Sequence, residues 1–355
     1  MPLDVGLIGA GNVSGAHLPA YRDRDELALA AVCDADEERA RDVADEFDVD
    51  YWTDYGAFVA EAPVEAVDVT LPHALHAPVA RAALEADLHV HVEKPFGVSM
   101  AECEALVALA EERDRRLMVG QMQRFAPEHR AVKRLVDEGA LGPVRHARAD
   151  GLQNLRDYAP PGHWLYDGSV AGGGGVISVL VHKLDLLRYF LGDVERVTAH
   201  ARTADDAFSD AEDYCTGTLV FESGAMADFY STYSAAGLPY GEAYWLFGDD
   251  AVVHALPAEG EYGTTPRICY GEDGAGEAFE PVSPADLPTT DPFVNELLHF
   301  ADCVAGSREP LTSGRDNLGT LATVLAIYES ADRGGESVAV DDLYGRGHGA
   351  GGGGS

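Results

Sequence analysis

The first third of the chain alternates short apolar runs with helical patterns, and this alternation constrains the fold more than any other feature of the sequence. The predicted strands cover residues 3–8, 27–33, 66–70, 88–92 and 117–119. A helix-like segment follows each of the first four strands, which is typical of parallel strands joined by crossover helices. Residues 1–122 are therefore predicted to form an α/β domain with a doubly wound parallel sheet.

The pattern changes after residue 122. We expect helices over residues 127–138, 176–190, 292–304 and 314–333, and strands over 144–149 and 337–340. Between residues 194 and 270, alternating strands and turns suit an open antiparallel sheet. Residues 123–344 are thus predicted to form a second α/β domain with a large open antiparallel sheet, followed by a flexible glycine-rich tail over 345–355.

Some helix boundaries are sharp in the sequence. Ser99 and Glu102 have the spacing of a capping box, which predicts a helix that begins there and runs to about Arg113. Gly139 is expected to end the helix over 127–138. Gly192 is expected to end the helix over 176–190, which has an amphipathic pattern.

The charge balance is unusual. The chain carries 61 Asp and Glu residues against 25 Lys and Arg, a formal net charge of −36. Such a surface repels phosphate backbones and anionic headgroups, so we expect neither a nucleic acid nor a membrane as a partner. Counterions screen this self-repulsion in concentrated salt, and we therefore interpret the protein as halophilic rather than merely acidic.

The sequence shows no pattern typical of a metal site, a signal peptide or a membrane span. The five cysteines lie far apart without metal-ligand spacing, so we expect no metal and a reducing compartment. The first predicted strand begins at once and leaves no room for a signal peptide. No apolar run approaches the roughly 20 residues of a membrane span. We expect a cytoplasmic protein.

A glycine-rich turn follows the first predicted strand. Gly9 and Gly11, with Asn12 and Val13, would let backbone N–H groups approach a pyrophosphate at the start of a helix. Asp34 ends the second strand, where a carboxylate binds the adenine ribose hydroxyls of NAD. The alternative is an ordinary strand–helix turn with Asp34 as a helix cap. Because strand, turn, helix and acid occur in this order, we favour the dinucleotide site.

Polar residues follow two later strands of the same predicted sheet. Thr70, Pro72, His73 and His76 either line the nicotinamide ribose or cap the next helix. Open α/β sheets bind ligands at the carboxyl ends of their strands.

Lys94 occupies such an end, between Glu93 and Pro95. Only Lys94, Lys133 and Lys183 remain in a chain that has otherwise lost lysine. A functional role for Lys94 is therefore favoured over a surface turn.

A histidine on the helix over 176–190 is the second candidate for chemistry. Asp185 follows His182 by three residues, on the same helical face, and could orient the imidazole as a general base. A lone helical histidine is usually a satisfied structural residue. The preceding glycines, 172–175, would permit close approach of a ligand and favour function.

These motifs resemble, in their order along nearly the whole chain, the glucose-fructose oxidoreductase and inositol dehydrogenase family, Gfo/Idh/MocA. The resemblance is carried by residues 9–13, 32–34, 72–76, 93–95, 119–121 with 124–125, 141–144, 172–174 and 182–188. It implies an N-terminal Rossmann domain, a C-terminal α/β domain whose sheet forms a homodimer or homotetramer, and NAD, with NADP possible, as cofactor. Lys94 and His182 match the family's catalytic lysine and histidine, whereas Ser178 stands where many members carry aspartate.

The resemblance implies a dehydrogenase that oxidises a hydroxyl of a sugar, sugar derivative or cyclitol by hydride transfer. The alternatives are an NAD-retaining glycosidase and a non-catalytic dinucleotide-sensing regulator, of which intact Lys94 and His182 disfavour the regulator. The predicted catalytic residues are Lys94, His182 and Asp185. The expected cofactor contacts also include Glu93 and Lys94, and the expected substrate contacts are Lys94, Gln121, Arg124, Trp164, Ser178 and His182.

Overall fold

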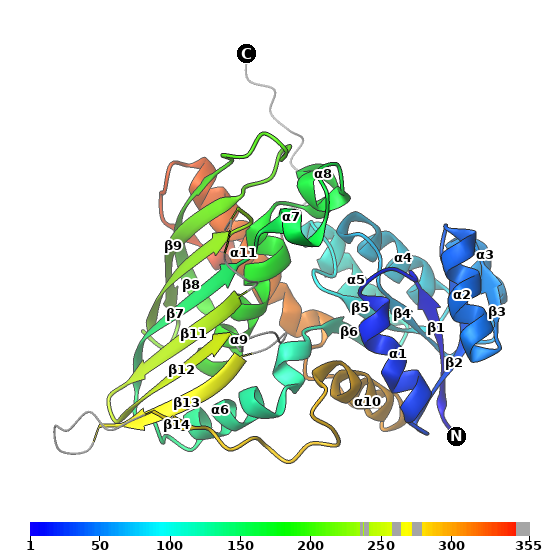
Figure 1. The fold of residues 1–355 in the computed structure, drawn as a ribbon, viewed down its shortest axis with the longest axis horizontal. Coiled ribbons are helices and arrows are strands. Elements are labelled where there is room, and N and C mark those ends of the chain that lie inside the picture. Colours follow the sequence, from blue (N-terminus) through cyan, green and yellow to red (C-terminus); the bar gives the residue numbers. More distant parts are fainter. Residues whose placement is uncertain (235–236, 238–240, 258–263, 272–278, 346–355) are drawn as a thin grey trace.

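The computed structural model describes residues 1–234, 237, 241–257, 264–271 and 279–345. Two sheets lie side by side, each with its own helices (Figure 1). The predicted α/β class is confirmed, with a parallel Rossmann sheet followed by a large, mostly antiparallel sheet. Apart from Gly345, the expected glycine-rich tail lies outside the described residues.

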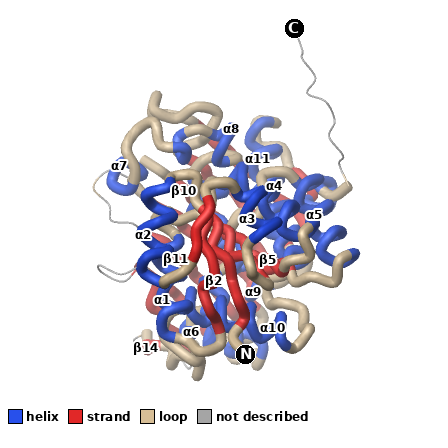
Figure 2. The backbone as a smooth tube through the Cα atoms, turned by 90° about the vertical axis from the view of Figure 1, so that its right-hand side faces the viewer, coloured by secondary structure: helices blue, strands red, loops and turns tan. Residues whose placement is uncertain are grey.

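The first sheet has six parallel strands in the order β3-β2-β1-β4-β5-β6, the arrangement of a Rossmann fold. Its strands are β1 Leu3–Ile8, β2 Leu27–Cys33, β3 Asp50–Trp52, β4 Ala66–Val69, β5 His89–Glu93 and β6 Leu117–Gly120. Helices α1 Ser14–Asp23, α2 Glu37–Phe47, α3 Tyr55–Glu61, α4 His73–Glu85 and α5 Met100–Glu112 surround it (Figure 2). The sequence did not predict β3, because this short edge strand is mostly exposed and has no apolar run.

The start of α5 differs in detail from the capping box. Ser99 is the N-cap residue, but its side chain makes no capping hydrogen bond. Its backbone carbonyl accepts from Cys103 N–H instead. The predicted boundary is correct, whereas the predicted side-chain bond is absent among the described residues.

The second sheet has nine strands in the order β14-β13-β12-β11-β7-β10-β9-β8-β15. They are β7 Val144–Leu152, β8 Val194–Arg202, β9 Tyr214–Phe221, β10 Met226–Thr232, β11 Gly241–Gly248, β12 Ala251–Pro257, β13 Thr264–Tyr270, β14 Glu280–Pro281 and β15 Val338–Ala339. The sheet is not wholly antiparallel as expected, since β7 and β10 pair in parallel. This pairing arises because the chain leaves β7 for a helical excursion before it returns.

That excursion contains the most buried helix of the molecule. The helices of this half are α6 Pro127–Asp137, α7 Leu155–Tyr158, α8 Gly168–Ala171, a π-helical segment Val176–Leu180, α9 Val181–Leu191, α10 Pro292–Ala305 and α11 Gly314–Asp332, with 3-10 turns at Met122–Phe125, Trp164–Tyr166 and Val340–Leu343. The expected amphipathic pattern over 176–190 is wrong, because nearly every side chain there is buried. The helix packs on the sheet on one side and on α11 and α6 on others.

One helical stretch is longer and more apolar than the sequence analysis, which found no run of membrane-spanning length, had indicated. Within the described residues, Gly168–Leu191 is the one helical stretch long and apolar enough to cross a membrane, and 89% of its most apolar window is buried inside the protein. Burial on all sides accounts for this hydropathy, which fits a core helix of the folded domain.

Helix α10 returns to the first sheet. It lies in the segment expected to form the second domain, yet Val294, Leu297 and Phe300 share one core cluster with Leu3 and Val5 of β1. It also packs against α1, as Figure 1 shows. The late part of the chain therefore contributes to the interior of the Rossmann half.

Candidate active site

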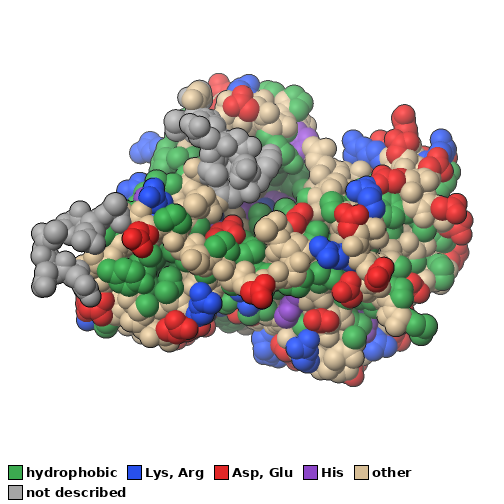
Figure 3. All heavy atoms as spheres, turned by 60° about the horizontal axis from the view of Figure 1, so that its bottom comes forward, with side chains coloured by type: hydrophobic (Ala, Val, Ile, Leu, Met, Phe, Trp, Pro, Cys, Tyr) green, Lys and Arg blue, Asp and Glu red, His purple; other side chains and the backbone are tan. Residues whose placement is uncertain are grey.

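A cavity of about 220 Å³ lies where the carboxyl ends of β4 and β5 meet the helical excursion of the second half. In Figure 3 the surface is hollowed between the two halves of the molecule. The predicted residues that line the cavity are Val13, Thr70, His73, His76, Glu93, Lys94, Trp164, Ser178 and His182. Nine positions spread over about 170 residues of sequence therefore meet at one wall, at the place where open α/β sheets bind ligands.

The glycine turn lies beside this cavity. Gly9 has φ +104°, and a Cβ there would come within 2.5 Å of the Thr70 carbonyl oxygen. Thr70 Oγ1 donates to the Gly9 carbonyl at 2.6 Å, which ties the turns after β1 and β4 together. A Cβ at Gly11 would meet open space, and α1 begins without a side-chain cap. The backbone at this end of α1 is thus accessible to a phosphate group.

Asp34 braces the same turn. Its Oδ2 accepts from Ala10 N–H at 2.7 Å, and its Oδ1 accepts from Asp36 N–H at 2.8 Å. Each carboxylate oxygen can accept a further hydrogen bond, so these contacts leave room for ribose hydroxyls. Asp36, not Asp34, caps α2.

Lys94 reaches across the cavity from the end of β5. Its Nζ donates to the Ser178 carbonyl oxygen at 2.7 Å, and its backbone N–H donates to Glu93 Oε2 at 3.1 Å. The Lys94–Pro95 peptide bond is cis. Burial lowers the pKa of Lys94, and the charge of Glu93 opposes this shift.

His182 faces Lys94 from the buried helix. Burial, and after it the charge of Lys94, lowers the pKa of His182 to about 4, so the imidazole is neutral at neutral pH. Its Nδ1 is buried and has no hydrogen-bond partner in the described part of the chain. A neutral imidazole beside a lysine ammonium can accept a proton from a bound hydroxyl.

A buried carboxylate fixes the start of that helix. Glu212 accepts from Gly174 N–H at 2.7 Å and from Val176 N–H at 2.8 Å. A Cβ at Gly174 would come within 1.8 Å of the Glu212 carbonyl oxygen. The glycine run therefore serves close packing against residue 212, which in turn places Ser178 and His182.

In the structure, Asp185 does not make the predicted contact with His182. Its carboxylate is held by Arg124 and by Thr320 Oγ1, which donates at 2.9 Å, and it makes no contact with His182. Asp185 and Arg124 are almost fully buried and lie away from the cavity lining. Arg124, predicted to contact the substrate, is therefore not part of the cavity lining. Helical spacing placed Asp185 near His182 in sequence, but the ion pair with Arg124 determines where its side chain points.

Gln121 also lies outside the cavity lining. Its amide Nε2 donates to Asn317 Oδ1 at 3.0 Å inside the protein, between β6 and α11. Gln121, predicted to contact the substrate, therefore does not line this cavity. Gly9, Gly11, Asn12, Asp34 and Pro72 belong to the turns after β1, β2 and β4 and not to the cavity wall.

The two histidines after β4 have separate roles. His73 Nδ1 lies 2.7 Å from the Ala171 carbonyl oxygen, and its ring packs edge-on against Trp164 with centroids 4.8 Å apart. The ring nitrogens of His76 lie 2.6 Å from the carbonyl oxygens of Pro95 and Leu71. His76 therefore joins the turns after β4 and β5, and both histidines line the cavity as well.

Several lining residues were not predicted from the sequence. They are Leu71, Met122, Gln153, Tyr158, Leu165, Val179, Tyr233 and Phe293. They come from scattered turns and helical segments without a motif, so no pattern identifies them.

Lys183 lies outside the cavity lining, and the sequence assigned it no role despite the scarcity of lysine. Its Nζ lies 2.9 Å from Glu242 Oε2 and donates to Gln123 Oε1 at 2.6 Å, in a buried cluster next to His182.

The fold and the lysine–histidine cavity beside a dinucleotide-type turn are typical of nicotinamide-dependent oxidoreductases. A family model described as "Oxidoreductase family, NAD-binding Rossmann fold" matches residues 3–121, and one described as "GFO/IDH/MocA C-terminal domain" matches residues 129–254. The chain therefore belongs to the Gfo/Idh/MocA family, as its motifs predicted. It is an NAD(P)-dependent oxidoreductase.

Named relatives match nearly the whole chain. A D-apiose dehydrogenase of Paraburkholderia graminis is 30% identical over 92% of this chain and 87% of its own length. A protein of Haloferax volcanii described as D-xylose 1-dehydrogenase (NADP(+)) 2 is 30% identical over 93% of this chain and 97% of its own. The structure of an aldose-aldose oxidoreductase from Caulobacter crescentus, complexed with glycerol, has a TM-score of 0.86 at 28% identity, covering 96% of this chain and all of that one.

Proposed function

We propose that this oxidoreductase oxidises a hydroxyl of a sugar, sugar derivative or cyclitol in the cavity between Lys94 and His182. The observation that carries the proposal is the position of these two side chains. Both line one cavity at the carboxyl end of β5, beside the glycine turn that opens α1. When bound, NAD(P) supplies the acceptor for the hydride that leaves the carbinol carbon.

The protein's own contribution is to handle the hydroxyl proton. His182 is neutral at neutral pH because burial and the charge of Lys94 lower its pKa to about 4, so it can take up the proton as the C–O bond gains double-bond character. The Lys94 ammonium stabilises the alkoxide character that develops on the same oxygen, an effect that is large in a site shielded from water. Ser178, which lines the cavity between them, is placed to contact the hydroxyl.

A polyhydroxylated substrate suits the lining. Trp164, Tyr158 and Tyr233 offer flat apolar faces for the C–H surface of a ring, while Gln153 and Ser178 offer hydrogen bonds to hydroxyls. The sugar and cyclitol dehydrogenases among the relatives support this substrate class.

For the cofactor, we propose that NAD is preferred over NADP. Gly9, Gly11, Asn12 and Val13 would hold the pyrophosphate, and Asp34 the adenine ribose. A carboxylate at the end of β2 accepts from ribose hydroxyls and repels a 2′-phosphate. The nearby Arg39 lies 3.5 Å from Asp36 in an exposed pair rather than beside Asp34.

We further propose a homodimer or homotetramer that works in a salt-rich cytoplasm. The face of the second sheet opposite α9 and α11 carries Met226, 54% exposed, and Phe247, 37% exposed, both next to His146 on neighbouring strands. Exposed apolar side chains on an uncovered sheet face favour association between copies. Sedimentation in concentrated KCl should give a dimer or tetramer for the wild type and a monomer for Met226→Glu combined with Phe247→Glu.

The decisive experiment is a substrate screen in molar KCl. Pentoses, hexoses, inositols and sugar phosphates are each tested for NADH and NADPH formation at 340 nm, and aryl glycosides are tested in parallel for release of the aglycone. Sustained formation of reduced cofactor in excess over enzyme supports a dehydrogenase. Release of a glycoside aglycone without net reduction of added NAD would instead indicate the NAD-retaining glycosidase, and tight NAD binding without turnover of any substrate would indicate the regulator.

A further inference from the structure

A buried chain of ionisable side chains runs through the Rossmann half and ends at Lys94. From α10, Glu296 Oε2 lies 3.6 Å from His91 Nε2. His91 Nδ1 lies 2.8 Å from Asp68 Oδ1, and Asp68 Oδ2 lies 2.8 Å from His17 Nδ1. His17 Nε2 lies 3.3 Å from Glu93 Oε1, and the other oxygen of Glu93 accepts from Lys94 N–H.

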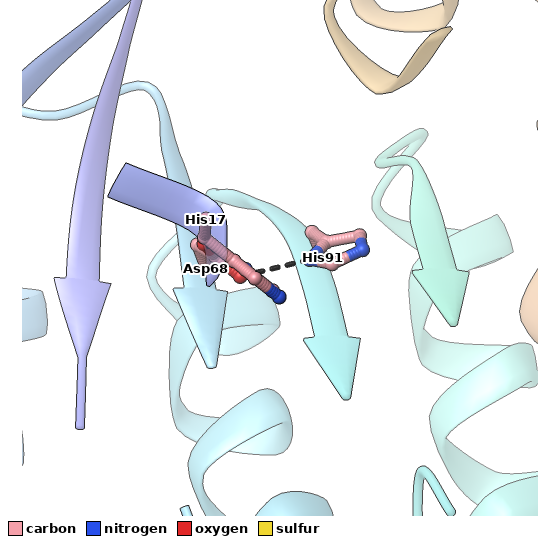
Figure 4. Close-up of side chains that lie close together, drawn as sticks. All are labelled: His17, Asp68 and His91. Carbon is pink, nitrogen blue, oxygen red and sulfur yellow. Dashed lines mark hydrogen bonds and ion pairs between the residues drawn. The ribbon is translucent and has the colours of Figure 1, made fainter. Parts of the chain in front are cut away.

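The centre of this chain joins three elements. Figure 4 shows His91 from β5 beside Asp68 from β4, with His17 from α1 overlapping Asp68 in this view. Asp68 has no exposed surface, and its Oδ2 also accepts from Tyr21 at 2.8 Å. The carboxylate is therefore surrounded by hydrogen-bond donors from two histidines and a tyrosine.

Three of these residues could be mistaken for a metal site. His17, Asp68 and His91 each offer one ligand atom within 4.8 Å of the others. However, the two imidazoles approach different oxygens of Asp68 at hydrogen-bond distance, and Tyr21 donates to one of them as well. Glu93 and Glu296 contact the outer ring nitrogens one each and do not converge on the same point. This geometry suits protons shared between pairs rather than a central cation.

We propose that His17, Asp68, His91 and Glu296 form a buried positioning network that keeps Glu93 ionised and thereby holds Lys94 charged and in place. The proposal rests on the proposed function of Lys94 and extends it to residues that do not touch the substrate. His17 is the key member, because it contacts both Asp68 and Glu93.

Proton positions in the network follow from what each nitrogen faces. Nδ1 of both histidines faces the Asp68 carboxylate, and Nε2 faces Glu93 in one case and Glu296 in the other. A ring nitrogen without a proton would point its lone pair at a carboxylate oxygen, so each imidazole is best accommodated as an imidazolium.

The pKa shifts of the histidines and of Glu93 agree with this assignment of protons. Burial by itself disfavours an imidazolium, yet the carboxylates beside them raise the pKa of His17 well above its usual value and that of His91 to about 9. Burial likewise opposes the charge of Glu93, but pairing with His17 holds its pKa below the usual range. At the far end, burial raises the pKa of Glu296 to about 7.

The ionised Glu93 then acts on Lys94 in two ways. One carboxylate oxygen holds the Lys94 backbone N–H, and the negative charge opposes the fall in pKa that burial imposes on the ammonium. The carboxylate lies close against Gly120 of the neighbouring strand, where a Cβ would come within 2.9 Å of Glu93 Oε1, so this packing requires glycine at position 120. Loss of the His17 charge should therefore favour protonation of Glu93 and lower the pKa of Lys94.

The charged and titratable groups that face the network are known for each packed element. They are Tyr21 from α1, Asp68 from β4, His91, Glu93 and Lys94 from the end of β5, and Glu296 from α10. Phe293 of α10 packs against the His17 ring and contributes no charge.

The test exploits the fact that the chain has three lysines. Trace acetylation of the intact protein in molar KCl, across a pH series, gives the reactivity of each lysine amine by mass spectrometry. Lys133 serves as an internal reference, because it is partly exposed and far from the network. His17→Gln should lower the apparent pKa of Lys94 by about one unit relative to wild type, the shift expected when a neighbouring charge is lost.

Two further variants make the result specific. Glu296→Gln keeps the side-chain shape at the end of the network that is farthest from Lys94. It should lower the apparent pKa of Lys94 by less than His17→Gln does. His89→Gln is the matched control, because His89 lies on the same strand but only accepts from Arg116 N–H at 2.9 Å. His89→Gln should leave the apparent pKa of Lys94 unchanged.

An unchanged Lys94 reactivity in folded His17→Gln would overturn the proposal. If that variant does not fold, equal reactivity of Lys94 in wild type and Glu296→Gln would do so. The readout requires no turnover, so it is independent of whether a sugar substrate is found. As a second readout, the alkaline limb of kcat against pH, where Lys94 loses its charge, should move to lower pH in His17→Gln and stay in place in His89→Gln.

Discussion

Arg124 and Asp185 form a buried bidentate ion pair, with Arg124 Nε 2.6 Å from Asp185 Oδ2 and Nη2 2.7 Å from Oδ1. Arg124 also pairs with Asp316 at 2.8 Å from α11. The pair therefore connects the turn after β6 to the helix that carries His182 and to α11. It holds the helix that carries His182 against the rest of the protein and is not part of the cavity lining.

Asp185→Asn should consequently damage stability more than chemistry. The change leaves the Arg124 charge buried with a weakened partner, and breaking a buried pair in this way typically costs about 3–5 kcal/mol. We expect a clear fall in the free energy of unfolding with kcat reduced far less than by loss of His182. The matched control is Asp249→Asn, which breaks an exposed pair with Arg145 and should cost at most about 1 kcal/mol. A large loss of kcat with unchanged stability would return Asp185 to the catalytic residues.

His182→Ala and Lys94→Met should each lower kcat by about 10²- to 10⁴-fold, the usual range for removal of an acid–base group. NAD affinity, measured by fluorescence titration, should remain nearly unchanged, because the glycine turn and Asp34 are untouched. Ser178→Ala should act mainly on substrate KM. Lys133→Met provides the control, since Lys133 pairs with Asp137 on the surface of α6 and lies outside the cavity. Near-normal kcat in His182→Ala across pH would refute its role as the base.

Most of the Rossmann half could be predicted from the sequence, because its strands, turns and helices are encoded in short local patterns. Strand bounds such as Leu3–Ile8 agree with the structure, and the residues at strand ends gather at the cavity as the topology requires. Asp185, Arg124 and Gln121 could not be placed in this way. The orientation of these side chains depends on partners that are distant in the sequence. Gln121 donates to Asn317 and Asp185 accepts from Thr320, and in both pairs the two residues lie more than 100 positions apart.

The second half was harder to predict for a related reason. The parallel pairing of β7 with β10 and the return of α10 to the first sheet depend on long-range packing that no periodicity encodes. The sequence also did not reveal the nearly complete burial of the helix that carries His182, since polar residues such as Lys183 and Asp185 are satisfied by distant partners. In the sequence alone, polar residues such as these on a helix are interpreted as a solvent-exposed face, because their buried partners are not visible there.

Glu212 should make stability depend on pH in the weakly acidic range. Burial raises its folded pKa from 4.5 to about 6, so the folded state binds this proton more tightly than the unfolded state. Stability from this group is therefore full below about pH 4.5 and is lost as the pH rises through 6, by about 2 kcal/mol. Glu212→Gln should remove that slope in urea unfolding between pH 4.5 and 6.5. An identical slope in wild type and variant would show that residue 212 does not titrate there.

Asp34 should decide the cofactor preference. We expect a higher catalytic efficiency with NAD than with NADP, and Asp34→Ala should weaken NAD by about 10- to 100-fold through lost hydrogen bonds from a charged acceptor. The same variant should lose less with NADP, because repulsion of the 2′-phosphate disappears with the carboxylate. Since Asp34 also accepts from Ala10 N–H, Asp34→Asn serves as a control that keeps an acceptor oxygen for the turn. Equal or better efficiency of the wild type with NADP would contradict the assignment.

Salt should control folding itself. Asp and Glu side chains are spread across the face in Figure 3 rather than gathered in one patch, and the whole chain carries a net charge of −36. The described exposed arginines such as Arg22, Arg145 and Arg315 are already paired with carboxylates, so the surplus of negative charge depends on solvent cations for screening. The screening length falls from about 10 Å at 0.1 M salt to about 3 Å at 1 M, which is shorter than most spacings between surface charges. We therefore expect the helical circular dichroism signal and activity to be lost on dilution from molar KCl to tens of millimolar, and restored by KCl but not by sucrose. Retention of full stability in dilute buffer would refute the halophilic interpretation.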